Sequence, residues 1–436
     1  MQGPLSVLLS AARSPTTDTA RAPGADSIDS LDVCLLSYRS DPYSGGQGVY
    51  MKYLSRALAA RGHGVTVVSG KPYPDLDAGI ELIRLPGENL VENPNRLTAF
   101  QPRYLRDPTS LFEWASVLTG GFPDPYAFGR RAADYLDKHG DRFDIVHDNQ
   151  SLAYGLLTVD QPTVATVHHP ITADRAVELE AADSRTQRML IRRWYRFLRM
   201  QQRVASRLPH ILVPSAATKR RTIADFNAAP EAISVVPNGV DTRQFRPRPG
   251  IRERPGRVIA TVSADVPLKG TRYLLEAFAI IRERHPDAEL LLIGELKDGG
   301  TAAGSLSELG LGDAVQVRSD LPVDRLAELY CTASVAVVPS VYEGFGLPAV
   351  EAMASGVPIV ATTGGALPEV VGEAGRLVAP RDASAMADAV SELLADRNLR
   401  KRLGRRARSR VVTAFDWDRT AKQTVDVYRQ AIDAHR

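Results

Sequence analysis

The residues best suited to chemistry lie in the short segment Pro339–Ala354, which combines two carboxylates with closely spaced glycines. Glu343 directly precedes the loop Gly344–Leu347, and Glu351 stands eight residues further on. Pro348 is suited to the first turn of a helix, where a missing N–H costs nothing. The loop therefore presents backbone N–H groups at a helix N-terminus, which favours a phosphate. Carboxylates accept hydrogen bonds from paired hydroxyls, such as those of a ribose or a hexose. The plain alternative is a helix start whose glutamates interact with the helix dipole.

This segment resembles the signature of the retaining glycosyltransferases of family 4, which have the GT-B fold. The resemblance covers about residues 31–430. It implies that Glu343 contacts the hydroxyls of the donor sugar and that Glu351 holds the ribose of the nucleotide. It also implies that the donor diphosphate faces the glycine turn, which consists of Gly344, Phe345, Gly346 and Leu347.

The second candidate is Lys269, which follows the first strand expected in the second half of the chain. A cation there could stabilise a diphosphate leaving group, whereas the alternative is an exposed loop lysine. In the family this Lys-Gly pair contacts the donor phosphates. The sequence departs from the family at Ala264, where an arginine is common. Either Arg272 substitutes, or stabilisation of the leaving group rests more on Lys269 and backbone groups.

The third candidate is the glycine loop Tyr43–Tyr50, which lies between the first expected strand and the first expected helix. Glycines let a ligand approach the backbone at a helix N-terminus. A dinucleotide fingerprint is excluded, because the third glycine and the acid after a second strand are both missing. The resemblance implies that Gly45 and Gly46 reach the donor diphosphate or the acceptor.

Histidines end two of the expected strands. His168 and His169 follow Thr166-Val167, and a side chain at the carboxyl end of a parallel strand faces the ligand-binding edge of its sheet. A buried structural histidine is the alternative. By resemblance His168 lies near the donor sugar, with His169 as the second choice. Asp174 could orient an acceptor, and His147 could contact it from the preceding strand.

The elements that must position these residues alternate between short β-rich runs and helical stretches, which predicts parallel sheets with helices on both faces. The alternation restarts after the Pro- and Gly-rich linker 246–256. We therefore predict an α/β chain with two facing, doubly wound Rossmann-like domains and a cleft between them. The predicted parts are a flexible tail (1–30), an acceptor-side domain (31–245), a donor-binding domain (246–415) and, as in the family, a C-terminal helix packing back on the first domain (416–436).

Composition limits the classes of function. The chain has 436 residues and a net charge of +3, which is too balanced to indicate nucleic acid. No run of about 18 apolar residues could span a bilayer, and no basic residue precedes the short apolar run near the N-terminus, so no cleaved signal is expected. Cys34 and Cys331 form no disulfide framework and are expected to be buried thiols in a reducing cytosol. No Cys/His cluster has metal-ligand spacing, so we expect no metal and no cofactor, with the nucleotide sugar as a substrate.

One stretch, Arg185–Arg207, carries eight arginines and no acid. As one helix, it would gather seven of them within an arc of about 100°, with an opposite apolar side that packs inward. The stretch is either a solvated basic face or a surface that attracts an anionic bilayer, on the inner face of a membrane, or a phosphate-bearing acceptor.

The sequence thus predicts a retaining glycosyltransferase that moves a hexose from a nucleotide diphosphate sugar, of the GDP-mannose or UDP-glucose type, to a hydroxyl of a glycan, glycolipid or small-molecule acceptor. Two alternatives stay open. A sugar-nucleotide epimerase or hydrolase would turn over the donor without an acceptor. A non-catalytic nucleotide-sugar binding protein, which Ala264 makes conceivable, would bind donor without transfer.

Overall fold

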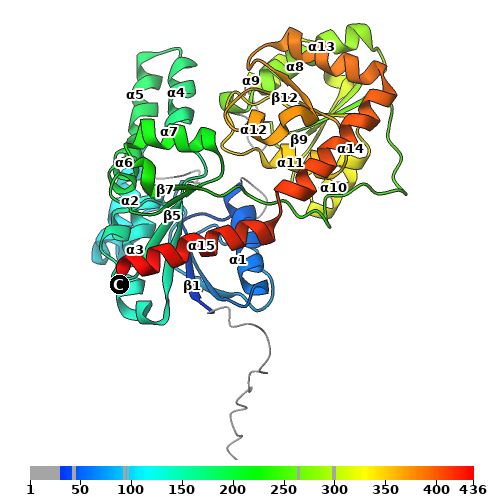
Figure 1. Ribbon diagram of the computed structural model, residues 1–436. Coiled ribbons are helices and arrows are strands. Elements are labelled where there is room, and N and C mark those ends of the chain that lie inside the picture. The colour runs from blue at the N-terminus through cyan, green and yellow to red at the C-terminus, as the bar shows by residue number, and fades with distance from the viewer. Residues whose placement is uncertain (1–29, 42–45, 92–94, 96–97, 263–265, 297–300) are drawn as a thin grey trace, which may run out of the picture. The chain divides into compact units, whose positions relative to one another are not determined.

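The computed structural model describes residues 30–41, 46–91, 95, 98–262, 266–296 and 301–436. Within it, Leu31–Arg436 form one compact unit, which contains two parallel sheets with helices on both faces (Figure 1). We call the part built on the first sheet the first lobe and the part built on the second sheet the second lobe. Gly45, Ala264 and the predicted tail, apart from Ser30, lie outside the described residues.

The first sheet has seven strands in the order β3-β2-β1-β4-β5-β6-β7. Its strands are β1 (Asp32–Ser37), β2 (Gly64–Ser69), β3 (Glu81–Arg84), β4 (Ile145–Asn149), β5 (Thr163–Thr166), β6 (Ile211–Val213) and β7 (Ile233–Val235). The accompanying helices are α1 (Gly46–Ala60), α2 (Pro108–Leu118), α3 (Asp124–His139), α4 (Thr172–Glu180), α5 (Arg185–Trp194), α6 (Leu198–Ala205) and α7 (Ala216–Phe226). Apolar cores lie on both faces of the sheet, as expected for central strands without alternation.

The second sheet has six strands in the order β10-β9-β8-β11-β12-β13. Its strands are β8 (Arg257–Thr261), β9 (Glu289–Ile293), β10 (Val315–Arg318), β11 (Val335–Val338), β12 (Ile359–Thr362) and β13 (Arg376–Val378). The helices are α8 (Thr271–Arg284), α9 (Thr301–Glu308), α10 (Val323–Cys331), α11 (Leu347–Ala354), α12 (Leu367–Val371), α13 (Ala383–Ala395) and α14 (Arg397–Ala414). The predicted α/β architecture with two doubly wound sheets is confirmed.

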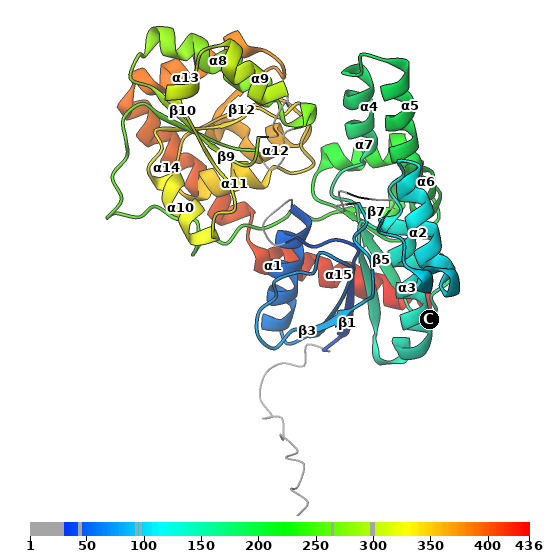
Figure 2. The same cartoon turned by 180° about the vertical axis from the view of Figure 1, so that it is seen from behind.

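Phe415 and Asp416 separate α14 from the last helix, α15 (Trp417–His435), which lies within the predicted C-terminal part, 416–436. The Asp416 carboxylate accepts a hydrogen bond from the Asp418 N–H and so caps α15. Trp417 and Tyr428 of α15 join the apolar core that covers one face of the first sheet, and α15 lies beside α1 (Figure 2). The last helix thus packs on the first lobe.

The prediction of one helix through the arginine-rich stretch is wrong. A 3-10 turn, Tyr195–Phe197, separates α5 from α6. Tyr195 is turned into the protein, where its hydroxyl donates to Glu178 (2.7 Å). The expected inward packing of the apolar side holds at Leu198 of α6, which is buried, but not at Leu190 of α5, which is 51% exposed.

Candidate functional site

Both sheets reverse their strand order at one point, between β1 and β4 in the first sheet and between β8 and β11 in the second. Ligands of open α/β sheets bind beyond the carboxyl ends of the strands at such a point. The predicted residues gather there: Lys269 follows β8, Glu343 follows β11, and His168 follows β5, the strand next to β4. Topology therefore brings residues from distant parts of the sequence to two sheet edges.

Lys269 and Glu343 form an ion pair. Glu343 Oε1 accepts hydrogen bonds from Lys269 Nζ (2.8 Å) and Ser340 Oγ (2.7 Å). The two charged side chains are only 23% and 11% exposed. The turn before α8 comes this close to β11 because Gly270, at φ 69°, has no Cβ, which would lie 2.1 Å from Pro339 O. The structure thus brings a cation and a carboxylate together at the end of β11.

The glycine turn also contacts the first lobe. A Cβ on Gly344 would lie 2.0 Å from the backbone oxygen of His168, so only glycine fits this approach. Gly344 O accepts hydrogen bonds from Ser215 Oγ (2.8 Å) and Thr218 Oγ1 (3.0 Å) at the start of α7. A Cβ on Gly46 would lie 3.4 Å from Leu347 Cδ1. The turn, the histidine segment and the start of α1 therefore lie close together.

The start of α11 keeps unused donors. The helix begins at Leu347 after Gly346 at φ 99°, with Pro348 in its first turn. Among the described residues, no group accepts a hydrogen bond from the backbone N–H of Phe345, Gly346 or Leu347. Free N–H groups at the positive end of a helix bind anions, so this end of α11 can hold a phosphate.

Glu351 lies one turn into α11. Burial raises its pKa to about 8, although the Tyr330 hydroxyl, 3.4 Å from its Oε2, lowers it. Tyr330 also bonds to Thr261 Oγ1 at the end of β8 (2.8 Å). The second predicted carboxylate therefore lies at the same switch point as Lys269, in an environment that disfavours its charge.

His168 is held as a neutral ring. Burial lowers its pKa to about 3, with smaller contributions from His169 and His147. Its Nε2 bonds to Asn149 Oδ1 (2.6 Å), while Asn149 Nδ2 donates to Ser37 Oγ (3.1 Å). This network assigns the imidazole proton to Nε2 and leaves Nδ1 as a hydrogen-bond acceptor. The Tyr50 ring packs against the imidazole at 4.6 Å.

Asn149 and Gln150, which position the two histidines, were not predicted from the sequence. Gln150 Oε1 accepts from the backbone N–H of His168 (2.7 Å), and its Nε2 donates to the backbone oxygen of His169 (2.8 Å). Gln150 and Leu152 both have left-handed backbones, at φ 58° and 46°, which costs energy for such residues. The buried carboxylate of Asp148 holds this turn through the Leu152 N–H (2.9 Å). The run of polar residues after β4 was the signal that could have identified them.

His169 and Asp174 form a second pair, with Nε2 and Oδ2 2.8 Å apart. Burial raises the pKa of Asp174, but His169, together with Lys269, outweighs it and leaves the pKa below its ordinary value. The charge of Lys269 therefore reaches Asp174 in the first turn of α4. The structure brings this predicted acceptor pair close to the donor-side cation.

The prediction that His147 contacts an acceptor is wrong. His147 is 1% exposed, and both ring nitrogens are used inside the core, by Tyr428 Oη (2.5 Å) and Thr166 Oγ1 (2.6 Å). Burial lowers its pKa to about 3. His147 is a structural residue that links α15 to the first sheet.

Arg272 does not turn toward the site, because it pairs with Glu276 on α8 (2.7 Å) and is 61% exposed.

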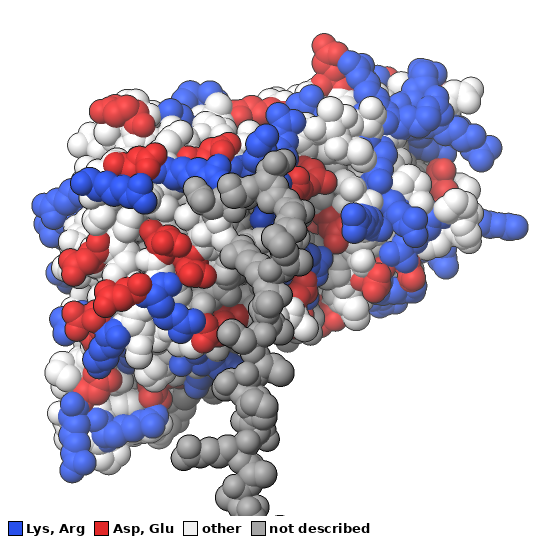
Figure 3. Space-filling view, turned by 60° about the horizontal axis from the view of Figure 1, so that its bottom comes forward, with Lys and Arg blue, Asp and Glu red and all other residues white. Residues whose placement is uncertain are grey.

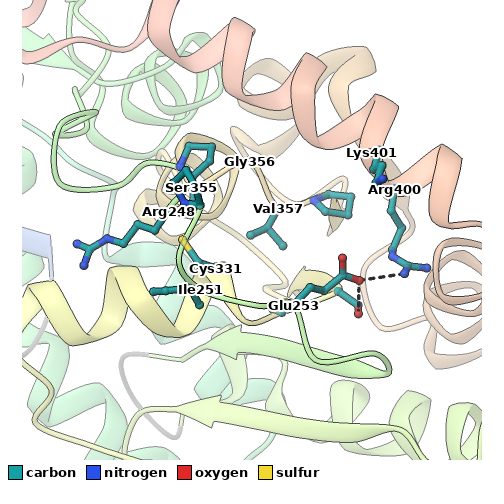
Figure 4. Close-up of a pocket in the computed structure, with 14 residues that line it drawn as sticks. Arg248, Ile251, Glu253, Cys331, Ser355, Gly356, Val357, Arg400 and Lys401 are labelled. Carbon is teal, nitrogen blue, oxygen red and sulfur yellow. Dashed lines mark hydrogen bonds and ion pairs between the residues drawn. The ribbon is translucent and has the colours of Figure 1, made fainter.

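Cys34 is buried, but Cys331 is only partly buried. It lines a cavity of about 250 Å³, under the linker, beside Ile251 and Glu253 (Figure 4). That cavity lies at the amino ends of β11 and β12, so it is remote from the carboxyl-end site.

The described part of the chain offers neither a metal-binding cluster nor a membrane-spanning helix. No group of three or more His, Cys, Asp or Glu residues there is arranged to hold a metal ion. No helix there is long and apolar enough to cross a membrane.

Two family models together match most of the chain: Glycosyltransferase Family 4 over residues 44–244, and Glycosyl transferases group 1 over residues 241–410. The MMP alpha-(1->4)-mannosyltransferase of Mycolicibacterium hassiacum is 47% identical over 92% of this chain and 98% of the relative. The D-inositol 3-phosphate glycosyltransferase of Corynebacterium jeikeium is 30% identical over 92% and 97%.

Two solved structures have a similar fold. Sucrose-phosphate synthase from Thermosynechococcus elongatus superposes with a TM-score of 0.69 at 25% identity, over 92% of this chain and all of that one. HepE from Anabaena, solved with UDP and glucose, has a TM-score of 0.66 at 17% identity, over 92% and 99%, and supports the fold alone.

Proposed function

Because this chain belongs to the family 4 glycosyltransferases of the GT-B fold, and so is a hexosyltransferase, we propose that it takes a hexose from a nucleotide diphosphate sugar and transfers it with retention of anomeric configuration. The hexose we propose is mannose, since the relative at 47% identity is named an alpha-(1->4)-mannosyltransferase. The acceptor is a hydroxyl of a glycan or of a lipid-linked glycan.

One observation carries the proposal: a cation, a carboxylate and a set of unused N–H groups meet at the switch point of the second sheet. Lys269 and the N–H groups of Phe345–Leu347 offer positive charge to a diphosphate. Glu343 offers a carboxylate to sugar hydroxyls, and Glu351 offers one to the ribose. His168, beside the turn, completes the sugar site from the first lobe.

The proposed chemistry is front-face substitution. The bond between the anomeric carbon and the diphosphate oxygen breaks while the acceptor oxygen bonds to the same face, and the acceptor proton passes to the leaving phosphate. Of the carboxylates at this site, Glu343 is engaged by Lys269 and Asp174 by His169, so neither is offered as a covalent nucleophile. The protein supplies orientation and charge stabilisation.

We also propose that no metal is needed, because Lys269 and the start of α11 can neutralise the leaving diphosphate. The test is transfer activity after treatment with EDTA. Activity that falls and returns with added Mg²⁺ would contradict this part of the proposal.

The function is tested first with a thermal-shift panel of GDP-mannose, GDP, UDP-glucose and UDP. A bound donor stabilises by RT ln(1 + [L]/Kd), about 2.7 kcal/mol at 100 times Kd. The expected result is a shift with GDP-mannose, followed by mannosyl transfer to an acceptor. Turnover of the donor into free sugar or an epimer, with no transfer to any acceptor, would favour the hydrolase or epimerase alternative instead.

The ribose assignment has its own test. Glu351→Ala should weaken binding of free nucleotide by about tenfold, which corresponds to about 1.4 kcal/mol, in isothermal titration calorimetry. Unchanged nucleotide affinity would remove Glu351 from the ribose site.

A peripheral contact with an anionic membrane is proposed for α5 alone. Arg185, Arg188 and Arg192 are exposed there, next to the exposed apolar side chains Met189 and Leu190, a combination typical of membrane-surface helices. Co-sedimentation with phosphatidylglycerol vesicles tests it. Arg185→Gln with Arg192→Gln should reduce the bound fraction, and an unchanged fraction would contradict the contact.

A further inference from the structure

A groove with an aromatic floor lies in the first lobe, away from the glycine turn. It encloses about 360 Å³ between α2 and α3 on one side and the segment from Arg193 to α6 on the other. Its floor contains Phe112 and Tyr126, whose ring centroids are 4.7 Å apart, and Phe122. The volume lies within the range of small-molecule sites.

Arginines surround the groove. Arg193, Arg196, Arg199 and Arg203 line it, and none of its lining residues is acidic. On the left part of the face shown in Figure 3, basic and acidic side chains lie side by side, whereas the charged residues that line the groove are all arginines.

The four arginines are of two kinds. Arg193 donates to Thr119 Oγ1 (2.6 Å) and Arg203 donates to Tyr154 Oη (3.2 Å). These two guanidinium groups are therefore engaged by neighbouring residues of the groove. Arg196 and Arg199 are exposed, and among the described residues neither forms an ion pair or a side-chain hydrogen bond. Two guanidinium groups are thus free to bind phosphate or carboxylate, which they match in geometry.

The groove lies at the edge of the first sheet where its strands end. Phe122 packs against Tyr38 with centroids 6.4 Å apart, and Tyr38 directly follows β1, a switch-point strand. Tyr154 begins the turn that follows the buried 149–152 segment, which positions His168. The groove and His168 therefore lie at the same edge of the first sheet.

We propose that this groove binds an anionic carbohydrate, namely the remote, phosphate- or carboxylate-bearing part of the acceptor. The C–H face of the sugar stacks on Phe112 and Tyr126, as aromatic faces favour, and its anionic group is bound by Arg196 and Arg199. The assignment of this ligand as acceptor rests on the proposed function, whereas the binding itself does not.

The experiment titrates the full chain with mannose 6-phosphate, mannose and inorganic phosphate in a calorimeter. Arg196→Gln with Arg199→Gln removes the free rim charges, and both positions are exposed, so the fold should persist. The matched control, Arg185→Gln with Arg192→Gln, removes two exposed charges of the same stretch outside the groove. Phe112→Ala removes a ring that is already 45% exposed.

The groove pair (Arg196→Gln with Arg199→Gln) should weaken mannose 6-phosphate binding at least fivefold. The control pair (Arg185→Gln with Arg192→Gln) should weaken it less than twofold. Phe112→Ala should weaken the binding of mannose 6-phosphate but leave the affinity for inorganic phosphate unchanged, since phosphate makes no stacking contact. Equal losses in both arginine pairs would show a general basic field and overturn the proposal. Saturable binding only to phosphatidylglycerol vesicles, lost in the groove pair, would assign the surface to lipid and also overturn it.

Nucleotide binding separates this inference from the proposed function. The groove variants should bind GDP or UDP as the wild type does, because Lys269, Glu343 and Glu351 lie in the second lobe. If the wild type bound sugar phosphate in the groove but no nucleotide, the proposed function would fail and the groove site would stand.

Discussion

At the scale of single residues, the pairing of Lys269 with Glu343 sets the state of the proposed donor site before a ligand binds. The two charges are largely shielded from water and neutralise each other at 2.8 Å. A diphosphate would compete for Lys269 and release a carboxylate oxygen toward sugar hydroxyls. Binding of the phosphates and binding of the sugar would then be coupled through one ion pair.

Lys269→Ala should therefore weaken the binding of nucleoside diphosphates far more than the binding of nucleosides. We expect at least a tenfold loss for GDP or UDP, about 1.4 kcal/mol, and less than a twofold loss for guanosine or uridine, measured by calorimetry. The control is Lys52→Ala, which removes the ion pair between Lys52 on α1 and Asp75. Equal losses for nucleoside and nucleotide would argue against a phosphate contact.

Glu351 predicts a pH dependence of stability. Its pKa is about 8 in the folded protein, against about 4.3 in an unfolded chain. The folded state therefore binds this proton more tightly, and folding stability falls as pH rises from about 4.5 to 8, then levels off. Glu351→Gln removes that cost, so its melting temperature should exceed the wild type's by more at pH 8 than at pH 5. A difference that is constant with pH would contradict the raised pKa.

How far the site could be predicted depends on how local its geometry is. Glu343, Glu351 and the glycine turn belong to one strand–loop–helix unit, so their spacing alone indicates a shared edge. Asn149 acts on His168 through the register of β4 against β5, where Asn149 lies opposite Thr166, and no local pattern reveals that. The partner of His147, Tyr428, is 281 residues away, so a strand-end histidine that seemed available is in fact buried.

At the scale of elements, the central strands and long helices were predictable because continuous burial leaves a clear apolar pattern. The edge strands β7 and β13 were not predicted. Each has three residues, of which only Ile233 is buried, so neither shows a run that differs from a loop. The break at Tyr195 also escaped prediction, because it depends on the tertiary contact with Glu178.

Helix α15 gives the prediction at this scale. Tyr428→Phe leaves the Nδ1 of His147 without a partner in the core, and a buried unsatisfied group costs about 1–3 kcal/mol. The free energy of unfolding, measured with urea, should fall by that amount. Tyr73→Phe removes a hydroxyl that bonds to Leu85 O in a partly buried place and should cost less. An unchanged stability in Tyr428→Phe would show that α15 is held by its apolar contacts alone.

At the scale of the whole unit, the proposed reaction needs both lobes. The proposed nucleotide contacts lie in the second lobe, whereas His168 and the pair His169–Asp174, proposed for the acceptor, lie in the first. The lobes meet where Glu369 of α12 accepts hydrogen bonds from the N–H groups of Ala216 and Ala217 (both 2.8 Å). A carboxylate at the positive end of α7 is favourable, so this contact helps to keep the histidines against the glycine turn.

Glu369→Ala should consequently separate binding from transfer. Nucleotide affinity should stay within twofold of the wild type, because no proposed nucleotide contact is touched. The kcat/KM for transfer should fall about fivefold to tenfold, corresponding to about 1–1.4 kcal/mol of lost transition-state stabilisation, since His168 is then less well held near the sugar. Glu373→Ala is the matched control, because this glutamate pairs with Arg406 within the second lobe and should change neither quantity. If nucleotide affinity and transfer fell together in Glu369→Ala, the contact would act by stabilising the second lobe and not by aligning the two lobes.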